Sequence, residues 1–436
     1  MHPRPRIAAL LAITAMLLAT AACAAQTKPE DLEIVRVPQD AATLADAADR
    51  VAPGGMILLA PGVYEEELLL DTPDVTVRGE DRNRTVIDGG GIRPYGVVAM
   101  ADGIRVENLT VTGATFYGVL FTGLHDESGP SAPTANGYEQ WDPSRFPPLQ
   151  RFLVDHVTVY NNGLYGIYAF NAHDGVIRDS YASGSADSGF YVGQCRECGI
   201  LVTGNIAERN AVGFENANAS DSVVVAGNRF AGNRIGMTLL SSYQEAFTPQ
   251  RANDIVGNLL IDNTASDSPA QAEGAFATGV GISGGQQNMF LRNRIAGNPR
   301  AGVILSNTED IPSSGNSFDG DVFESNGVDI ANISAERTPA SGNCAPAGLT
   351  SAPAQLAAQL EAACAGAADA EASTASLTDP AAPAGVSFLR VAPPRDQPNL
   401  PQRAEYPRLP DTVAMPDLAL FTVPDPSFLA ERAGTR

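Results

Sequence analysis

Tyr168, Tyr191 and Glu215 occupy equivalent positions in three successive repeats of the sequence. Each follows a glycine and one apolar residue, so stacked repeats would place the two rings and the carboxylate in one column on the outer surface. Aromatic rings pack against the apolar faces of sugars, and a carboxyl group can donate or accept a proton. The column therefore predicts an exposed carbohydrate-binding surface with Glu215 as a candidate catalytic acid or base.

Polar side chains follow this column at the next turn of each repeat. Asn171, Gln194 and Asn218 occupy equivalent turn positions, and His173 closely follows the first of them. The amides could bind sugar hydroxyls, and His173 is a second catalytic candidate. The alternative is structural: amides at such turns can form a ladder of hydrogen bonds from coil to coil, and the tyrosines can be ordinary strand residues on an exposed face.

Two oversized repeats border the column. Their excess residues, 124–150 and 242–250, both follow the glycine-led strand of their repeat. Insertions in a stack of coils leave at turns, so both should project from the same flank, whereas a third insertion, 264–277, should leave from a different turn. The first insertion contains Trp141, the only tryptophan, which is a further candidate for stacking on a substrate.

The repeats themselves predict the fold. Glycine followed by an apolar residue recurs at intervals of about 23 residues, a period typical of solenoids. These glycines are Gly96, Gly118, Gly166, Gly189, Gly213, Gly236, Gly281, Gly302 and Gly327. Asparagine or aspartate recurs in a second register, at Asn108, Asp155, Asp179, Asn205, Asn228, Asn258, Asn293 and Asn316. Side chains alternate after each glycine, with Ile167 and Ala169 inward. We therefore expect an all-β chain, a right-handed parallel β-helix over residues 34–345.

The two ends of this β-helix carry expected caps. Residues 41–51 have helical spacing and suit a cap on the first coil, and residues 346–364 should form a C-terminal capping helix. The rest of the chain, 365–436, is rich in alanine and proline and is expected to be an extended or disordered tail. Within it, 388–391 and 418–423 are apolar enough to dock on the coils.

The N-terminus indicates export. Residues 1–22 combine two arginines with an apolar run and small residues, as a signal peptide does. Cys23 follows in a sequence that resembles a bacterial lipobox, so we expect a lipidated cysteine, a membrane contact through the lipid alone, and a lipoprotein of the bacterial cell envelope. Cleavage near Ala24 or Ala25, giving a secreted or periplasmic soluble protein, is the alternative.

Four further cysteines are expected to form disulfides. An even number in an exported chain favours pairing, and the local spacing favours Cys195 with Cys198 and Cys344 with Cys364. A redox or zinc role for the first pair would require a thioredoxin-like context or a second ligand pair.

The composition does not favour a nucleic-acid-binding protein or a copper protein. The formal net charge of −22 is opposite to the basic footprint of a nucleic-acid-binding protein. The histidines His125, His156 and His173 are scattered, as are the methionines, which does not favour copper. No metal and no other cofactor is expected, although the acidic residues could bind calcium loosely.

Several stretches resemble a known superfamily. Val37-Pro-Gln-Asp-Ala-Ala-Thr-Leu, Ala60-Pro-Gly-Val-Tyr-Glu-Glu and Val75-Thr-Val-Arg-Gly look like the opening of the pectin-lyase-like β-helix superfamily. The centre, around Gly189-Phe-Tyr-Val-Gly-Gln and Gly213-Phe-Glu-Asn-Ala-Asn, resembles its carbohydrate-binding and sugar-hydrolase class, which includes NosD-type copper accessory proteins. The resemblance covers residues 34–345.

That resemblance implies a protein that binds a polysaccharide and processes it as a lyase, hydrolase or epimerase. Two alternatives stay open: a non-catalytic structural or adhesion module of the envelope, and a copper accessory protein. The Gly-His-Gly and Arg-Ile-Lys stretches of polygalacturonases and the Asp-Pro-His motif of mannuronan epimerases do not occur in this sequence.

Overall fold

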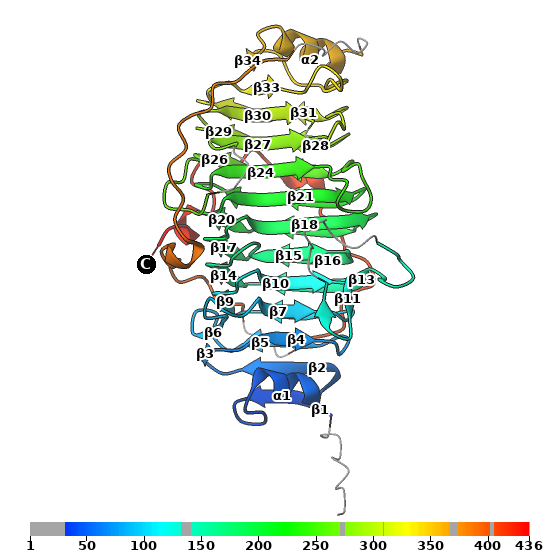
Figure 1. Cartoon of the computed structure of the whole chain (residues 1–436), viewed down its shortest axis with the longest axis vertical. Coiled ribbons are helices and arrows are strands. Elements are labelled where there is room, and N and C mark those ends of the chain that lie inside the picture. Colours follow the sequence, from blue (N-terminus) through cyan, green and yellow to red (C-terminus); the bar gives the residue numbers. More distant parts are fainter. Residues whose placement is uncertain are drawn as a thin grey trace, which may run out of the picture. The chain divides into compact units, whose positions relative to one another are not determined.

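A computed structural model describes residues 31–131, 141–270, 275–307, 309–366, 374–401 and 405–435. Within these ranges, short parallel strands form three sheets along a stack of coils (Figure 1). Each full coil adds one strand to sheet A, then one to sheet B and one to sheet C, before the chain enters the next coil. This is the parallel β-helix expected from the repeats.

Sheet A contains, in order, β1 (Leu32–Val37), β2 (Val51–Leu59), β5 (Thr76–Gly79), β8 (Arg105–Glu107), β13 (Leu149–Asp155), β16 (Ala172–Arg178), β19 (Ile200–Thr203), β22 (Val223–Ala226), β25 (Asp254–Val256), β28 (Met289–Leu291) and β31 (Ser317–Asp319). Sheet B contains β3 (Gly62–Tyr64), β6 (Thr85–Asp88), β9 (Thr110–Thr112), β14 (Thr158–Tyr160), β17 (Tyr181–Ser183), β20 (Ile206–Glu208), β23 (Arg229–Phe230), β26 (Leu259–Ile261), β29 (Arg294–Ala296) and β32 (Val322–Glu324). Sheet C contains β4 (Leu68–Leu70), β7 (Tyr95–Ala99), β10 (Tyr117–Thr122), β15 (Ile167–Phe170), β18 (Ser188–Arg196), β21 (Val212–Ser220), β24 (Ile235–Leu240), β27 (Thr278–Ser283), β30 (Ala301–Ser306), β33 (Ile330–Asn332) and β34 (Ser351–Ala352). A separate antiparallel hairpin pairs β11 (His125–Asp126) with β12 (Gly129–Pro130).

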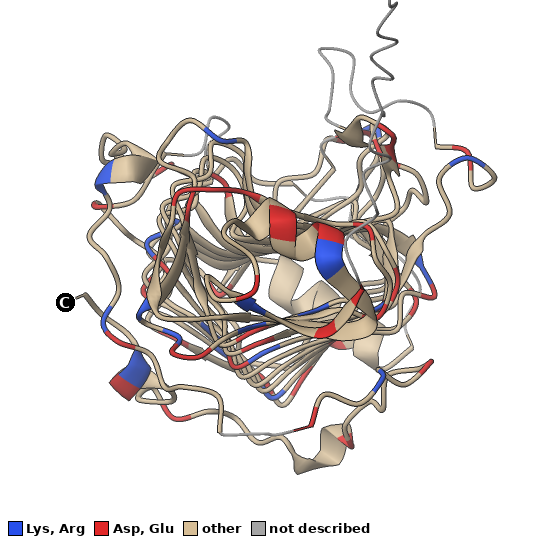
Figure 2. Ribbon diagram, turned by 90° about the horizontal axis from the view of Figure 1, so that it is seen from below, with Lys and Arg blue, Asp and Glu red and all other residues tan. Residues whose placement is uncertain are grey.

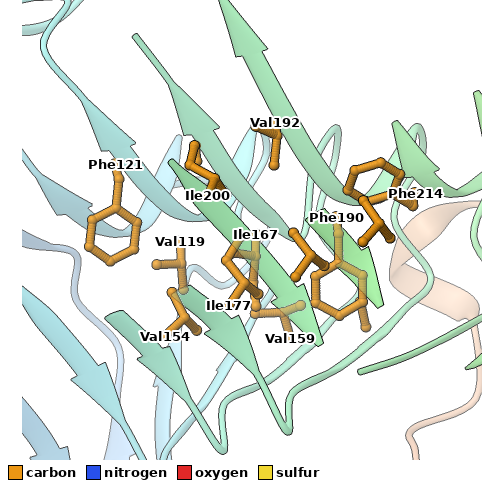
Figure 3. Close-up of a cluster of buried hydrophobic side chains, with 14 of the residues drawn as sticks. Val119, Phe121, Val154, Val159, Ile167, Ile177, Phe190, Val192, Ile200 and Phe214 are labelled. Atoms are coloured by element: carbon orange, nitrogen blue, oxygen red, sulfur yellow. The ribbon is translucent and has the colours of Figure 1, made fainter. Parts of the chain in front are cut away.

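The core lies inside the coils, where side chains of all three sheets meet. Val154 of sheet A, Val159 of sheet B and Ile167 of sheet C are fully buried and point toward one another (Figure 3). Ile167 and Ala169 both belong to this core, as the alternation predicts. Because no single coil can bury its apolar face, the stacking of coils supplies the stability of the fold.

The glycine stack has a steric cause. A Cβ atom at Gly166 would lie 2.5 Å from the carbonyl oxygen of Gly189, and similar contacts recur from Gly96 to Gly302. From Gly96 to Gly302, glycine allows the coils to approach this closely at the start of the sheet C strands. Two expected positions are wrong by two residues: Gly279 occupies the place predicted for Gly281, and Asp329 the place predicted for Gly327.

Asparagine ladders hold successive coils together at the turns. Asn205, Asn228, Asn258 and Asn293 form a buried chain of side-chain hydrogen bonds that ends on Asp321. Asn316 belongs instead to a different ladder, formed by Asn288, Asn316 and Asn343. A third ladder, not foreseen, contains Asn210, Asn233, Asn263, Asn298 and Asn326. Each amide satisfies buried backbone groups as well, which would otherwise destabilise the turn.

Helices cover both ends of the stack. α1 (Leu44–Arg50) begins at Thr43, whose hydroxyl accepts a hydrogen bond from the Asp46 amide, and it buries Leu44 and Ala47. α2 (Leu356–Cys364) buries Leu356 and Leu360 and is joined to the last coils by the Cys344–Cys364 disulfide. The second expected disulfide, Cys195–Cys198, is also present.

The C-terminal tail, expected to be extended or disordered, is extended and docked on the coils over 374–401 and 405–435. It runs along the outside of the coils and contains three short 3-10 turns, η1 (Phe388–Arg390), η2 (Leu418–Leu420) and η3 (Ala430–Arg432) (Figures 1 and 2). Its carbonyls accept hydrogen bonds from arginines of the coils, namely Arg82, Arg105, Arg229, Arg234, Arg292 and Arg294. Apolar residues of the tail, such as Leu418 and Phe421, also pack against Val224 and Val256 of the coils, so these donors and apolar contacts together hold the tail in place.

Candidate functional site

The predicted column lies on the outer side of sheet C. Tyr168 of β15 pairs in register with Tyr191 of β18, which pairs with Glu215 of β21. The rings pack in a cluster outside the main core, which confirms their outward direction. Their expected exposure is wrong: the exposed fractions are 2% for Tyr168, 3% for Tyr191 and 8% for Glu215.

Neighbouring tyrosines explain part of this burial. Tyr165 lies 4.5 Å from Tyr191 and 4.7 Å from Tyr168 between ring centroids. Tyr117 stacks on Tyr165 at 5.6 Å and on Tyr95 at 5.8 Å. We refer to these five residues as the tyrosine cluster. Tyr95, Tyr117 and Tyr165 were not predicted, although each stands three residues before the column position of its own coil.

The two insertions leave from the same turn, as predicted, and they touch. Trp141 of the first insertion contacts Phe247 of the second with 4.6 Å between ring centroids. The Trp141 indole donates a hydrogen bond to the Phe146 carbonyl, and the Arg196 guanidinium lies over the Phe247 ring. Trp141 therefore joins two loops that border the column.

The turn amides hold these insertions in place. The Asn171 side chain donates to the Phe146 carbonyl. The side-chain oxygen of Gln194 accepts from the Ala246 backbone amide. Asn218 donates to the carbonyls of Ser242 and Glu245 and to the Thr248 hydroxyl. All three amides are buried, so contact with a substrate in this conformation is not possible. They form loop anchors instead of the predicted coil-to-coil ladder.

Glu245, in the second insertion, was not predicted. The Tyr191 hydroxyl donates to Glu245 Oε1 at 2.6 Å, and Glu245 Oε2 is buried without a hydrogen-bond partner among the described residues. Burial raises the pKa of Glu245 to about 8, and the nearby charge of Glu309 acts in the same direction. The hydrogen bond from Tyr191 lowers the pKa of Glu245 in part, and the net upward shift favours the protonated form of this carboxyl group. A carboxylate within a loop beside the column was the only signal in the sequence.

Glu215 lies on the other side of Tyr191. Its Oε2 atom accepts a hydrogen bond from the Ser188 hydroxyl at 2.5 Å. Because Glu215 pairs with Tyr191 across adjacent strands and Glu245 binds the Tyr191 hydroxyl, one ring has a carboxyl group at its base and another at its tip. We call Glu215, Tyr191 and Glu245 the carboxyl–tyrosine triad.

His173 is placed apart from this triad. It lies on β16 of sheet A, where it pairs in register with Gln150, whereas Glu215 lies on sheet C. Burial lowers the pKa of His173, and its Nε2 atom is buried without a partner among the described residues. The structure therefore does not bring the two predicted catalytic residues onto one sheet.

An open cavity of about 700 Å³ lies on the same side of the β-helix, toward its N-terminal end. It lies between α1 and the β11–β12 hairpin, and Leu69 of β4 and Met100 form apolar parts of its wall. Its polar lining residues are Asp49, Glu67, Asp71, His125, Asp126, Glu127 and Ser128. Met100 also packs against the apolar cluster outside the main core to which Tyr117, Tyr168 and Tyr191 belong, so the cavity adjoins that apolar cluster. This volume is within the range of small-molecule sites, about 300–1,000 Å³.

Comparison with known proteins settles the handedness. Residues 149–323 match the sequence model of a family described as "Right handed beta helix region". The chain is a right-handed parallel β-helix. No curated protein sequence matches it.

Solved structures that resemble this β-helix include several enzymes. The A-module of mannuronan C-5 epimerase AlgE6 from Azotobacter vinelandii is 18% identical, with a TM-score of 0.48 over 67% of this chain and 83% of that one. An alginate lyase from Paenibacillus sp. str. FPU-7 is 14% identical, with a TM-score of 0.42 over 67% of this chain and 97% of that one. The DFA-IIIase of Arthrobacter chlorophenolicus A6, without its lid, is 13% identical, with a TM-score of 0.43 over 67% and 84%.

One group of potential metal ligands occurs in the described part of the β-helix. Atoms of Asp155, His156 and Asp179 lie within 4.8 Å of one another. The Asp155 carboxylate, however, binds the His156 ring and the Arg178 guanidinium, and Asp179 lies 4.0 Å from Arg432. Guanidinium groups already balance the carboxylates, so the donor set does not suit a cation.

The described part of the β-helix contains no helix long and apolar enough to span a membrane. Cys23 and the expected signal peptide lie outside the described residues.

Proposed function

We propose that the outer side of sheet C binds a carbohydrate chain and that Glu245 and Glu215 act on it as acid and base. The observation that carries the proposal is the carboxyl–tyrosine triad, in which the Tyr191 hydroxyl binds one carboxyl group, whose pKa burial raises to about 8, while the second lies on the adjacent strand. Pairs of carboxyl groups with different environments divide acid and base roles between them.

The adjoining cavity supports the binding part of this proposal. Apolar atoms of Leu69 and Met100 can contact the faces of sugar rings, and the surrounding carboxylates can accept hydrogen bonds from hydroxyl groups. The triad itself lies beneath residues 242–250, so a bound chain must displace this segment to reach it. Asn218 and Gln194, which hold the segment, then set how easily it moves.

Binding can be tested at the apolar wall of the cavity. Leu69 is 37% exposed on β4 of sheet C, and aspartate at this position would place a charge where a sugar face should pack. On an array of soluble neutral and acidic polysaccharides, Leu69→Asp should bind the best ligand of the unmodified protein about tenfold more weakly, which corresponds to roughly 1.4 kcal/mol.

Val63→Asp is the matched control, because Val63 is 63% exposed on β3 of sheet B. It should bind as the unmodified protein does. Equal losses in both variants, or no binding of any polysaccharide by the unmodified protein, would contradict the proposed function.

We further propose that the protein is exported and anchored to the bacterial envelope by a lipid on Cys23. The support is the leader-like composition of residues 1–22 and the small residues that precede Cys23. Cys23→Ser should move the protein from the detergent-soluble membrane fraction to the soluble exported fraction. Unchanged partitioning on fractionation of the cells would rule out the lipid anchor.

A further inference from the structure

We infer that residues 242–250 form a lid over the carboxyl–tyrosine triad, and that the lid opens when Glu245 loses its proton. Such a lid regulates access to the proposed site, so the inference rests on the proposed function, although its test needs no glycan. The attachment of this segment to the coils supports it.

The two ends of the lid are fixed to each other. The Ser241 hydroxyl accepts a hydrogen bond from the Gln250 amide at 2.9 Å and donates to the Gly284 carbonyl at 2.7 Å. Ser241 and Gln250 are both buried. The residues between them therefore form a compact loop with a closed neck, which can move as a unit about its ends.

Polar contacts, and not buried apolar side chains, hold the lid on sheet C. None of residues 242–249 is buried as a whole. The attachments of the lid include the backbone groups bound by Asn218 and Gln194, the ring contact of Trp141 with Phe247, the hydrogen bond from the Tyr243 amide to Glu309, and the hydrogen bond from Tyr191 to Glu245. Segments held by so few contacts open at a low cost in free energy.

The attachment at Glu245 depends on a proton. Its Oε1 atom accepts from the Tyr191 hydroxyl at 2.6 Å, whereas its Oε2 atom is buried without a hydrogen-bond partner among the described residues. A neutral carboxyl group tolerates this position, but an ionised one places charge on a buried oxygen that no donor reaches. Ionisation therefore disfavours the closed lid, because opening returns the carboxylate to water.

Two arginines lie near the lid and contact other groups. Arg196 of β18 lies over the Phe247 ring, 5.5 Å from its centroid. Arg251, directly after the lid, binds the Asp221 carboxylate at 3.0 Å. The pKa of Glu245 is shifted instead by burial, by the Tyr191 hydrogen bond and by the charge of Glu309.

The direction of the pH response follows from these causes. Burial raises the pKa of Glu245 to about 8, Glu309 after β30 acts in the same direction, and the hydrogen bond from Tyr191 opposes them. Glu215, which pairs with Tyr191, and exposed Tyr243 are the other titratable groups around the lid. The ordinary pKa is 4.5, so the closed lid keeps a proton that the open lid releases between 4.5 and 8. Closure should weaken as the pH rises through this range.

Trp141 reports the position of the lid, because it is the only tryptophan and its ring lies 4.6 Å from that of Phe247. Its fluorescence is measured in the purified protein while acrylamide, an uncharged quencher, is added. We expect the quenching constant to be at least about twofold larger at about pH 9 than at about pH 5, because the lid withdraws from Trp141. The circular dichroism of the β-helix should not change over this range.

Two variants separate ionisation from attachment. Glu245→Gln should abolish the increase in quenching, because glutamine keeps the shape of the neutral carboxyl group and cannot ionise. Glu309→Gln should reduce the increase by at least about half, because it removes a charge that repels ionised Glu245. Its amide oxygen can still accept from the Tyr243 amide. If Glu309 served only as an attachment, the variant would show more quenching at both pH values, which would contradict the inference.

Glu361→Gln, on the exposed side of α2, is the matched control and should respond as the unmodified protein does. Equal quenching of the unmodified protein at both pH values, or the same increase in Glu245→Gln, would overturn the lid and leave the proposed carbohydrate site in place. Failure of every polysaccharide on the array to bind would overturn the proposed function and leave the pH response of the lid.

Discussion

Replacing Glu245 by glutamine should reduce turnover of a bound glycan by about 10²- to 10⁴-fold, the usual contribution of general acid catalysis. Burial raises the pKa of Glu245 to about 8, and glutamine reproduces both the shape and the lack of charge of the protonated form that this shift favours. The amide oxygen can still accept the hydrogen bond from the Tyr191 hydroxyl, but the amide has no proton to transfer. Binding should therefore persist while turnover is lost.

The pH dependence gives an independent check. The pKa of Glu245 is about 8 in the folded chain and 4.5 as its ordinary value, so the folded state holds a proton that the unfolded state has released between these values. Stability should accordingly decrease as the pH rises from about 4.5 to 8, and activity should decrease as the pH rises through about 8. In Glu245→Gln this decrease in stability with rising pH should be absent.

Exposed Glu336 provides the matched control, because it lies far along the sequence from the triad and outside the cavity lining. Glu336→Gln should retain full activity. Unimpaired turnover in Glu245→Gln would exclude Glu245 as the acid.

Replacing Arg82 by methionine should destabilise the β-helix by about 1–3 kcal/mol, the range expected when buried acceptors lose their hydrogen-bond donor. Arg82 is completely buried and lies between β5 and β6. Its guanidinium group donates to the Thr158 hydroxyl and to the carbonyls of Val157, Asp179 and Pro398. Methionine fills part of the volume but removes the donor of the Thr158 hydroxyl and of the Pro398 carbonyl, whereas the Val157 carbonyl still accepts from the Tyr181 amide and the Asp179 carbonyl from Arg432.

The measurements are the urea midpoint of unfolding and the rate at which a protease cleaves the tail. Asn399→Ala tests the contact with the tail separately from the buried guanidinium group. The Asn399 side chain, in the tail, accepts a hydrogen bond from the Arg82 backbone amide. This variant should speed proteolysis of the tail and change the midpoint little. A free energy of unfolding in Arg82→Met within about 0.5 kcal/mol of the unmodified protein's value would refute a structural role for the guanidinium group.

The repeat pattern of the sequence predicted the coils, because each of its signals has a local cause. Glycine recurs where a Cβ atom would meet the next coil, and apolar residues alternate because successive strand side chains point to opposite faces. The same regularity placed Tyr168, Tyr191 and Glu215 in one column and both insertions at one turn. The paired cysteines followed from their spacing.

Tertiary structure decided what covers that column. Whether an outward ring is exposed depends on where an irregular insertion folds back, and an insertion has no periodicity to indicate its path. Residues 242–250 cover Tyr191 and bring Glu245 to its hydroxyl, and the turn amides bind these loops instead of one another. Desolvation by that loop, and not the sequence around Glu245, raises its pKa.

The tail and the cavity were likewise beyond the reach of sequence patterns. Alanine- and proline-rich composition indicates a segment without a core of its own, but it does not reveal the arginine donors that lie hundreds of residues away in the chain, such as Arg82 for Pro398. The cavity forms where α1 and the β11–β12 hairpin, far apart in sequence, border the same strands of sheet C. The repeat pattern of the sequence predicts the β-helix. Long-range contacts determine which of its surfaces are open and how their charges are paired.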